Sequence, residues 1–501
     1  MYGIEAIPIT VETNLGKGIN FFLVGLPDSA IKESHQRIKA AFTNSDYKFP
    51  QREITINMAP ADIRKEGSAY DLTIAVGILS ASEQIINDEI DKYIIMGELS
   101  LDGGLQPIRG ALSIAIKARD MGYKGFILPK QNANEAAIVE GIDIIGCENI
   151  QEVVDHFNGS KCIAPSKFVH TENENNALNY LIDFADVKGQ EHVKRALEIA
   201  AAGGHNILLV GPPGSGKTML AKRLPTILPP LTIDEALETT KIHSVAGLVG
   251  ANNGLLMTRP FRSPHHTVSD VALVGGGSNP KPGEISLAHN GILFLDELPE
   301  YKRQVLEVMR QPLEDRVVTI SRAKMSVEYP AGFMLVASMN PSPSGNFYDA
   351  NDPNSDPEIV VKRYLQKISG PLMDRIDLHI EVPAVKFDEL ADVRKGELSE
   401  QVRKRVIAAR EVQAARLKEY RGIYYNAQLN PQLMEKYCII SDAGQLLLKN
   451  AMDKMGLSAR SYGRILKVSR TIADLENAPN IEPHHLAEAI QYRSLDRGGW
   501  I

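Results

Sequence analysis

The feature that most constrains this chain is a glycine-rich octapeptide, residues 211–218, which lies between two apolar runs. It has the sequence GPPGSGKT and fits the pattern G-x-x-x-x-G-K-[ST]. Residues 206–210 before it predict a buried strand, and residues 219–224 after it predict the first turns of a helix. This order places backbone N–H groups and a helix N-terminus around a phosphate group. The sequence therefore predicts an α/β domain that binds a nucleotide.

The loop positions have distinct expected parts in holding ATP and Mg²⁺. Lys217 reaches the β- and γ-phosphates, and the Thr218 hydroxyl ligates the metal. The alternative, a glycine-rich turn with an unrelated lysine, is disfavoured by the strand before it and the helix after it. The residues predicted to bind the nucleotide here are Gly211, Pro212, Pro213, Gly214, Ser215, Gly216, Lys217, Thr218 and Met219.

A second apolar strand, residues 291–295, ends in two carboxylates, Asp296 and Glu297. Asp296 is expected to hold the same Mg²⁺ as Thr218, and Glu297 to orient or deprotonate the attacking water. A buried strand with a solvated acidic end would also explain this motif taken alone. Together with the glycine-rich loop, the two carboxylates predict hydrolysis of the γ-phosphoryl bond.

Length and composition indicate a multidomain protein of ordinary globular type. A chain of 501 residues is too long to fold around a single hydrophobic core. Its residues are 44% hydrophobic and 23% charged, which is ordinary for globular proteins. No apolar run could span a membrane, no secretory signal is visible, and the three cysteines are too far apart for a zinc or disulfide framework. We therefore expect a cytoplasmic protein without a membrane partner. The net charge of −7 argues that any nucleic-acid contact is local.

Four segments of different character follow one another along the chain. Residues 1–157 alternate strands with helices, residues 158–176 predict a polar linker, residues 177–383 form the nucleotide module, and residues 384–501 are helical in pattern. The clearest strands are expected at residues 21–25, 53–57 and 125–129. The clearest helices are expected at residues 68–82, 111–121, 398–420, 458–475 and 483–492.

Taken together, four motifs resemble the YifB/ComM family of magnesium-chelatase-like AAA+ ATPases. They are residues 183–190 (DFADVKGQ), the glycine-rich loop, residues 259–266 (RPFRSPHH) and residues 370–377 (GPLMDRID). The resemblance covers nearly the whole chain. It implies a P-loop AAA+ core of three α/β layers, a helical C-terminal lid and an N-terminal domain similar to the Lon protease domain. It also implies a hexameric ring motor that acts on single-stranded or branched DNA, with branch migration during natural transformation as the role.

The resemblance also assigns parts to residues outside the two motifs. Asn340 looks like sensor 1, between the metal and the attacking water, although a turn-forming Asn before a proline is the simpler interpretation. Arg375 looks like an arginine finger supplied to the neighbouring subunit, with a salt bridge to a flanking aspartate as the alternative. Arg460 looks like sensor 2, with Arg464 as its rival. Val187 and its neighbours are expected to line the adenine side, mostly through their backbone.

Two segments are candidates for the DNA contact. Residues 316–321 and 325–329 alternate as strands around Arg322 and Lys324 and predict a hairpin with a basic tip. Such a hairpin lines the pore of related rings, so the resemblance implies a contact with the phosphate backbone, although a solvated tip is the plain alternative. His265 and His266 lie in a glycine- and proline-rich insertion. Adjacent histidines cannot face one metal from a regular element, so packing, hydrogen bonding or a DNA contact is expected, in that order.

The chain departs from its relatives at two places. Family members often carry cysteines after sensor 1, where this chain has Ser342 and Ser344, so no zinc is predicted. In the N-terminal domain Ala69 occupies the position of the Lon nucleophile, and the partner lysine falls near Leu112. A fold without proteolytic activity is therefore expected. The alternative is an alignment shifted by one residue, which would make Ser68 the nucleophile, with Lys117 a few helical turns from the position of the partner lysine.

Two rival functions from other classes remain open at this point. The nucleotide core also resembles the ATPase subunit of a magnesium chelatase, which would imply a role in Mg²⁺ insertion into a porphyrin. The Lon-like domain argues against that role. A protein-remodelling ATPase, with the N-terminal domain as a docking module, is the other possibility.

Overall fold

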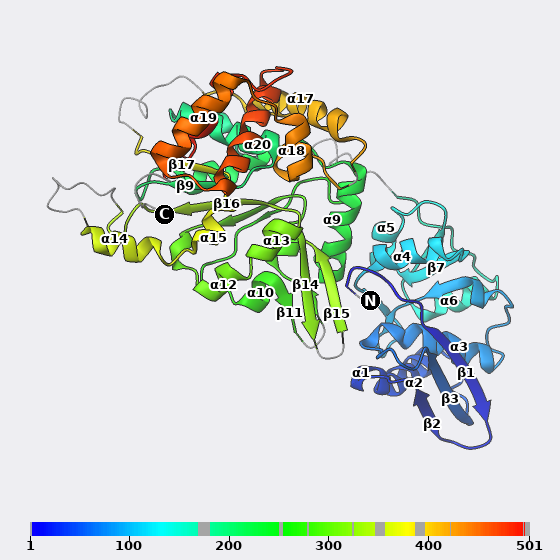
Figure 1. Ribbon diagram of the computed structural model, residues 1–501. Helices are drawn as coiled ribbons and strands as arrows, with labels where there is room; N and C mark the ends of the chain where they lie inside the picture. Colours follow the sequence, from blue (N-terminus) through cyan, green and yellow to red (C-terminus); the bar gives the residue numbers. More distant parts are fainter. Residues whose placement is uncertain are drawn as a thin grey trace. The chain divides into compact units, whose positions relative to one another are not determined.

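The computed structural model describes residues 3–168, 181–249, 254–277, 280–322, 325–345, 356–385, 396–420, 422–493 and 495 (Figure 1). The chain forms two compact units, a first unit of residues 1–174 with 233–256 and a second unit of residues 175–232 with 257–501. Within the described ranges, no helix combines the length and the apolar character needed to cross a membrane. The linker and domain boundaries expected from the sequence stay predictions.

The first unit is built on two small sheets and a two-stranded ribbon. One sheet has the order β1-β3-β2, with β1 antiparallel and β2 parallel to β3. The other has the parallel order β4-β7-β8, and β7 is buried at every position, as expected for a central parallel strand. The strands are β1 (Thr10–Gly16), β2 (Phe21–Val24), β3 (Glu53–Ala59), β4 (Tyr93–Ile95), β5 (Glu98–Leu99), β6 (Leu105–Gln106), β7 (Gly125–Pro129) and β8 (Asp143–Cys147).

Helices cover these sheets, and one of them comes from a distant part of the chain. Helix α9 packs against α4, and the backbone N–H of Gly110 donates to the carbonyl of Ser244 over 3.3 Å. The Ser244 hydroxyl also donates to the Glu135 carboxylate. The helices are α1 (Ser29–Lys32), α2 (Ser34–Asn44), α3 (Asp71–Ala81), α4 (Ala111–Asp120), α5 (Lys130–Ala136), α6 (Ile150–Phe157) and α9 (Ile233–Ala246). The contacts thus assign α9 to the first unit, although the sequence places it inside the nucleotide module.

The second unit contains a five-stranded sheet in which all neighbours are parallel. Its order is β10-β13-β16-β9-β17. The strands are β9 (Ile207–Val210), β10 (Phe261–Arg262), β13 (Ile292–Leu295), β16 (Met334–Met339) and β17 (Leu378–Glu381). Every residue of β9, β13 and β16 is buried, which explains their continuous apolar sequences. Strand β9 comes first of these five in the sequence, but in the sheet it lies between β16 and β17, which come last. The strand order therefore reverses at β9. In open α/β sheets ligands bind beyond the carboxyl ends of the strands at such a point.

Short helices and two antiparallel ribbons surround the sheet. The helices are α7 (Glu191–Gly203), α8 (Lys217–Arg223), α10 (Asp270–Val274), α11 (Glu284–Leu287), α12 (Arg303–Glu307), α13 (Arg310–Asp315), α14 (Glu358–Leu365) and α15 (Gly370–Met373). The ribbons pair β11 (Gly275–Gly276) with β12 (Lys281–Pro282), and β14 (Val317–Arg322) with β15 (Met325–Pro330). The hairpin expected around residues 322–324 is therefore confirmed. The Arg322 side chain and all of Lys324 lie outside the described residues.

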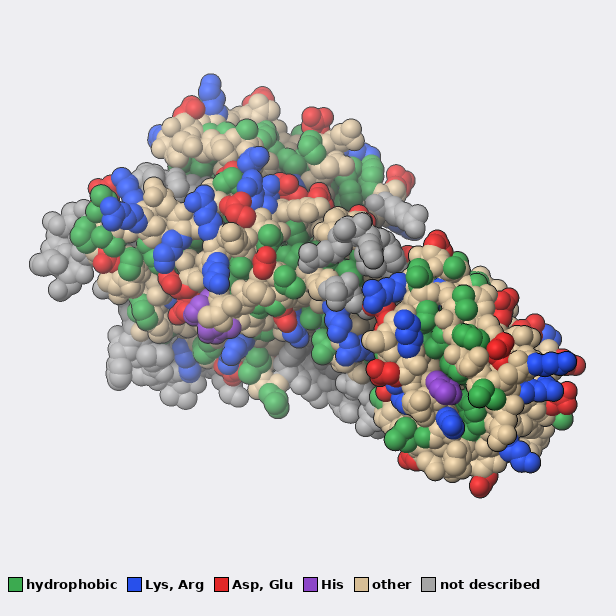
Figure 2. All heavy atoms as spheres, turned by 90° about the horizontal axis from the view of Figure 1, so that it is seen from below, with side chains coloured by type: hydrophobic (Ala, Val, Ile, Leu, Met, Phe, Trp, Pro, Cys, Tyr) green, Lys and Arg blue, Asp and Glu red, His purple; other side chains and the backbone are tan. Residues whose placement is uncertain are grey.

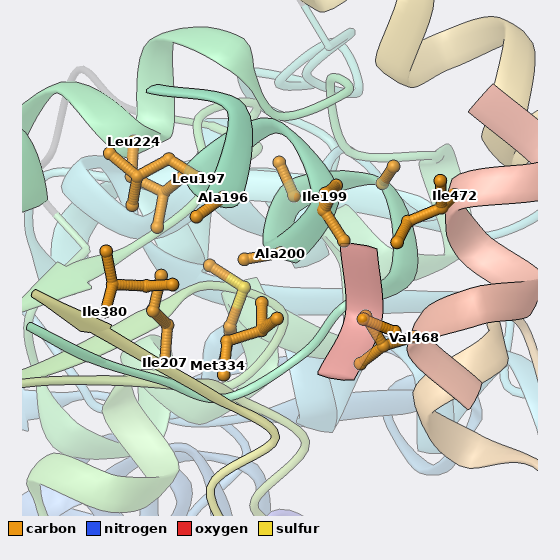
Figure 3. Packing of buried hydrophobic residues seen from close by; sticks show 14 of the residues in the cluster. Ala196, Leu197, Ile199, Ala200, Ile207, Leu224, Met334, Ile380, Val468 and Ile472 are labelled. Carbon is orange, nitrogen blue, oxygen red and sulfur yellow. The ribbon is translucent and has the colours of Figure 1, made fainter. Parts of the chain in front are cut away.

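The C-terminal helices share one apolar core with the sheet. Side chains of α7 such as Ala200 lie between Ile207 of β9 and Ile380 of β17 on one side and Ile472 of α20 on the other (Figure 3). Ala200, Ala201 and Ala202 are fully buried, because small side chains let α7 approach the C-terminal helices closely. These helices are α17 (Ser399–Leu417), α18 (Pro431–Tyr437), α19 (Asp442–Met455), α20 (Ala459–Leu475) and α21 (Pro483–Gln491).

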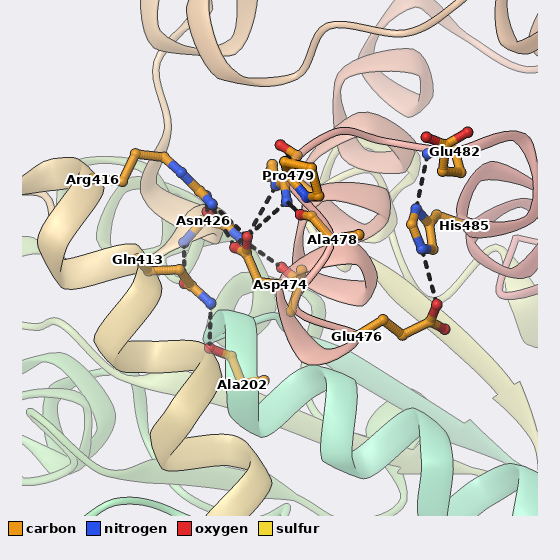
Figure 4. Close-up of polar contacts among 12 residues, drawn as sticks. Ala202, Gln413, Arg416, Asn426, Asp474, Glu476, Ala478, Pro479, Glu482 and His485 are labelled. Atoms are coloured by element: carbon orange, nitrogen blue, oxygen red, sulfur yellow. Dashed lines mark hydrogen bonds and ion pairs between the residues drawn. The ribbon is translucent and has the colours of Figure 1, made fainter.

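A buried polar network fixes the C-terminal helices to one another and to α7 (Figure 4). Asp474 accepts hydrogen bonds from Arg416, Arg470 and Asn426. Gln413 donates to the carbonyl of Ala202 over 3.2 Å. The guanidinium groups compensate the charge of the buried carboxylate, and loss of one partner would leave a buried charge unpaired.

Glu476, His484 and His485 bring three potential metal ligands within 4.8 Å of one another. The Glu482 backbone N–H donates to His485 Nδ1 over 2.9 Å, at the start of α21. The Nε2 of a neutral His485 must then carry its proton, which points at Glu476 3.1 Å away (Figure 4). The cluster is therefore a helix cap rather than a metal site.

Asp377 joins the start of β17 to α20 and lies wholly inside the second unit. Its carboxylate accepts from the Asn206 backbone N–H over 3.1 Å and from Arg464 over 2.7 Å, and it faces His205 at 3.3 Å. Burial alone would raise the pKa of Asp377, but the charge of Arg464 and the hydrogen bond with His205 hold that pKa below its usual value. The carboxylate is therefore charged and fully compensated.

Replacement of Asp377 by alanine is expected to destabilise the protein by about 3–5 kcal/mol, because Arg464 would stay half-buried without its partner. Chemical denaturation followed by circular dichroism measures the change. The matched control is Asp374→Ala, which breaks a surface pair with Arg460 and should cost less than about 1 kcal/mol. Equal denaturation midpoints for Asp377→Ala and wild type would contradict the assignment.

The mixed α/β architecture, the parallel sheet and the helical C-terminal region agree with the sequence prediction. The strands and helices expected above are confirmed, with residues 68–70 of the helix at 68–82 forming a 3-10 turn. The sequence did not predict strand β10. It has only two residues, lies between Pro260 and Pro264, and is too short to show any periodicity.

Candidate nucleotide site

The glycine-rich loop follows β9 and has a backbone that only glycines allow. Gly214 and Gly216 have φ angles of 77° and 89°. A Cβ on Gly211 would lie 2.1 Å from the Val382 carbonyl oxygen, so this glycine lets the loop pass close to the end of β17. The loop therefore curls at the carboxyl end of the sheet and leads directly into α8.

Lys217, the first residue of α8, points back into the loop. Its Nζ donates to the carbonyls of Gly211 and Pro212 over 2.7 and 2.9 Å, and to Asn340 Oδ1 over 3.1 Å. Burial lowers the pKa of Lys217, against the opposing charges of Asp296 and Glu297. A bound phosphate would favour the charged ammonium, so the loop is set to receive an anion.

Asp296 lies at the end of β13 and meets Thr218 from the loop. The Thr218 hydroxyl donates to Asp296 Oδ2 over 2.8 Å, and the Ser338 hydroxyl donates to the other carboxylate oxygen. Hydroxyl and carboxylate oxygens are the ligands that Mg²⁺ prefers, so the pair fits this ion. Ser338 was not predicted, and its only signal is a hydroxyl within the otherwise apolar strand β16.

Glu297 is the next residue, and its carboxylate is mostly exposed. Its backbone is left-handed, with φ 54°, and its N–H donates to Asp296 Oδ1 over 3.1 Å. The Glu297 side chain is 61% exposed, and its Oε2 lies 3.5 Å from His266 Nδ1. The carboxylate is thus free to reorient and has a histidine beside it that the sequence did not assign to this site.

Asn340 follows β16 and borders an open cavity of about 460 Å³. The cavity wall includes Glu297 and Asn340 from the site and two cations, Arg363 and Lys367, that no motif indicated. Lys367 pairs with Glu300 over 3.1 Å. The remaining wall is formed by Glu300, Ser342, Pro343, Val360 and Tyr364.

The partners of Arg375 and Arg460 do not belong to the glycine-rich loop. Arg375 follows α15, and its guanidinium donates to the Pro371 carbonyl and pairs with Glu314. Arg460, in the first turn of α20, pairs with Asp374 over 3.1 Å. Arg464 is held by buried Asp377 instead. Of the two candidates for sensor 2, Arg460 is thus the more exposed, and its carboxylate partner lies at the surface rather than in the core.

Val187 is buried in the core, with 1% of its surface exposed. Its neighbour Gln190 reaches across to the loop, donating to the carbonyls of Ser215 and Pro383 over 2.9 Å each. Gln190 therefore fixes the segment of residues 183–190 to the glycine-rich loop.

After Asn340, the described residues close a loop through oxygen contacts. The hydroxyls of Ser342 and Ser344 lie 3.0 Å apart, and the Ser344 N–H donates to Asp356 over 2.7 Å. That hydrogen bond lowers the pKa of Asp356. Residues 346–355 lie outside the described residues, and the absence of zinc stays a prediction.

In the first unit, the Ser68 hydroxyl donates to the carboxylate of Glu98, and Leu112 is fully buried. The partner of the Ser68 hydroxyl is thus a carboxylate, whereas a Ser–Lys pair requires a lysine.

Family profiles match the chain in three places. The profile of magnesium chelatase, subunit ChlI, matches residues 183–390, and that of its C-terminal part matches residues 396–493. A third profile, subunit ChlI of Mg-chelatase, matches residues 11–132.

Two similar proteins match over their whole length. The competence protein ComM of Haemophilus influenzae is 45% identical over 99% of this chain and 96% of that protein. The protein YifB of Escherichia coli is 44% identical over 99% of this chain and 96% of the length of YifB.

More distant similarities cover parts of the chain. The DNA replication licensing factor mcm6 of Dictyostelium discoideum is 26% identical over 65% of this chain and 34% of its own length. Lon protease 2 of Bacillus subtilis is 31% identical over 29% of this chain and 27% of its own length.

Proposed function

Since the chain belongs to the YifB/ComM family of magnesium-chelatase-like ATPases, we propose that it is an ATP-hydrolysing ring motor that acts on DNA. One observation carries the ATPase part of this proposal. Lys217, Thr218, Asp296 and Asn340 come from three separate strand ends and are joined by hydrogen bonds at the carboxyl edge of one sheet.

Each of these residues has a defined task in hydrolysis. The loop N–H groups and Lys217 hold the phosphates, and Thr218 and Asp296 hold Mg²⁺, which supplies charge neutralisation when bound. Glu297 takes the proton of the attacking water. Asn340, which already contacts Lys217, orients that water. The Glu297 side chain is mostly exposed, which leaves its carboxylate room to reach this water.

The positions of Arg375 and Arg460 support a ring. Both lie around Asp374, and their partners there are Glu314 and Asp374. An arginine held in this way can serve the nucleotide of a neighbouring copy after exchanging its carboxylate partner for a phosphate. We propose that the two arginines act together in trans, in a ring of six copies.

The DNA part of the proposal rests on the hairpin and on the relatives. The name of the mcm6 relative refers to DNA replication. Lys and Arg side chains are interspersed with Asp and Glu over the face shown in Figure 2, as expected for local rather than general contact with nucleic acid. Turnover measured with and without a forked duplex tests this part. An ATPase rate that does not change when single-stranded or forked DNA is added would contradict the proposed action on DNA.

Replacement of both Arg322 and Lys324 by alanine is expected to abolish DNA stimulation and to leave basal turnover unchanged, because the hairpin tip would lose its phosphate contacts. The measurement is the ATPase rate against DNA concentration at two salt concentrations. A matched control, Lys404→Ala with Lys449→Ala, removes the same charge from exposed helix positions. An unchanged DNA response in the hairpin variant would remove the hairpin from the mechanism.

A second candidate function is the ATPase subunit of a chelatase, favoured by the ChlI profiles. Stimulation of turnover by a porphyrin with partner subunits, and none by DNA, would support it. For the first unit we propose a Lon-like fold without proteolysis, consistent with the partial match to Lon protease 2 and the Ser68–Glu98 contact. A protein-remodelling role would instead show as stimulation by unfolded protein.

A further inference from the structure

We propose that the cavity beside Asn340 receives the phosphate cleaved from ATP, and that Arg363 and Lys367 bind this phosphate before it leaves the protein. The proposal rests on the ATPase function proposed above and adds to it a binding site for the product. The same two cations could instead serve the γ-phosphate of ATP before cleavage. The two cases differ in whether loss of the cations weakens the binding of free phosphate or the binding of ATP.

The cavity shares part of its wall with the catalytic residues. Asn340 and Glu297 both border it, and Asn340 Oδ1 accepts from Lys217 of the glycine-rich loop over 3.1 Å. In phosphoryl transfer the attacking and leaving oxygens are roughly in line, so the phosphoryl group moves away from ADP and towards the attacking water. Because Glu297 is the proposed base for that water, the product moves towards the side on which the cavity lies.

One face of α14 and of the turn after it supplies the cations of the cavity wall. The residues of this face are Val360, Arg363, Tyr364 and Lys367. Their spacing of three or four positions is that of side chains on one side of a helix. Lys362 lies next to Arg363 in the sequence, but it is not among the described residues that border the cavity. The helix therefore presents two of its cations to the cavity and directs another elsewhere.

This face of α14 is fixed to the ends of two strands of the sheet. Tyr364 is buried, and burial raises its pKa to about 12 against the opposing effect of a hydrogen bond with the Asn340 backbone. Lys367 Nζ lies 5.6 Å from the centre of the Tyr364 ring and 3.1 Å from a carboxylate oxygen of Glu300. The Glu300 N–H donates to the Glu297 carbonyl over 2.8 Å. Both cations thus stand beside the catalytic strand ends.

The charges of the wall suit an anion. Four of the nine wall residues are charged, which favours an ion over an apolar ligand. Lys367 shares its charge with Glu300, whereas no described residue forms an ion pair with Arg363. A guanidinium can bind phosphate through two N–H groups at once, and an ammonium binds it as a point charge. Phosphate and ADP repel each other after cleavage, so cations on the far side of the cavity would draw the phosphate away.

The test measures the affinity of inorganic phosphate for the full-length protein loaded with ADP and Mg²⁺. Calorimetric titration gives this affinity directly, and inhibition of ATP turnover by added phosphate gives it independently. Arg363→Gln and Lys367→Gln are each expected to weaken phosphate binding about 10-fold, because each removes a hydrogen bond to a charged ligand. Binding of a fluorescent ATP analogue should stay as in the wild type.

Glu300→Gln is expected to change phosphate affinity in the opposite direction. The amide no longer competes for Lys367, so phosphate should bind about 3-fold more tightly, in keeping with the small free energy of an exposed ion pair. If Glu300 and Lys367 only held the wall together, this variant would weaken phosphate binding as Lys367→Gln does. Weaker binding in Glu300→Gln would therefore contradict the proposal.

Lys362→Gln is the matched control, because it removes the same charge from the same helix. Lys362 pairs with Glu358 over 2.6 Å at the surface. This variant should keep the phosphate affinity of the wild type. The unfolding temperature of each variant shows whether it folds normally.

Two results would overturn the proposal. One is wild-type phosphate affinity in both Arg363→Gln and Lys367→Gln. The other is weaker ATP binding with phosphate binding intact, which would assign the cations to the substrate. Failure of the ATPase function gives a different result: the wild type would cleave no ATP, while its ADP-loaded form would still bind phosphate through the two cations.

Discussion

Replacement of Arg375 by alanine is expected to reduce ATP turnover by roughly 10³-fold while ATP binding persists, because an arginine finger stabilises the charge of the transition state rather than the bound substrate. Steady-state turnover and the binding of a fluorescent ATP analogue measure the two quantities. Arg464→Ala is unsuitable as a control, since Arg464 holds buried Asp377. Lys404→Ala, at an exposed helix position, is the suitable one.

Mixing two inactive variants tests whether Arg375 acts in trans. Lys217→Ala lacks a working phosphate loop but retains its arginine, and Arg375→Ala has the reverse defect. In a mixed ring, Lys217→Ala subunits supply the finger to neighbouring Arg375→Ala sites, so turnover should reappear. A mixture as inactive as its components, with rings still formed, would show that the arginine serves its own subunit.

The pairing of Arg375 with Glu314 has a consequence for assembly. In the single chain the guanidinium is already bound by a carboxylate and is only 8% exposed. A finger must leave this partner before it reaches a phosphate. We therefore expect turnover per subunit to rise with protein concentration until rings are complete, and a dilute monomer to hydrolyse ATP slowly.

Glu297→Gln is expected to lower turnover by about 10²- to 10⁴-fold, because an amide cannot accept the proton of the attacking water. ATP binding and ring formation should persist, since neither the loop nor Asp296 is altered. Single-turnover hydrolysis measures the chemical step, and light scattering measures the ring. The control is Glu307→Gln, which changes a surface pair with Arg310.

Two results would contradict this role for Glu297. A Glu297→Gln variant with wild-type turnover would show that another group activates the water. Loss of ATP binding in this variant would place Glu297 in substrate binding instead.

Much of the site could be predicted because its determinants are local. Gly214, Gly216 and Lys217 lie within four positions, and the positive φ angles of the two glycines leave few other residues possible. Strands β9 and β13 were visible as short apolar runs because both faces of a central parallel strand are buried. The placement of Asp296 followed from its position at the end of such a run.

The sequence by itself determined the nucleotide loop, the acidic strand end and the α/β character of the chain, because each depends on residues next to one another. Only the tertiary structure decided that Ser338 binds Asp296, that His266 faces Glu297 and that Arg460 meets Asp374. It also decided that α9 packs with the first unit. The three side-chain contacts join residues that are 31, 42 and 86 positions apart. Such contacts depend on how strands and helices pack, and packing between distant elements leaves no periodic signal in the sequence.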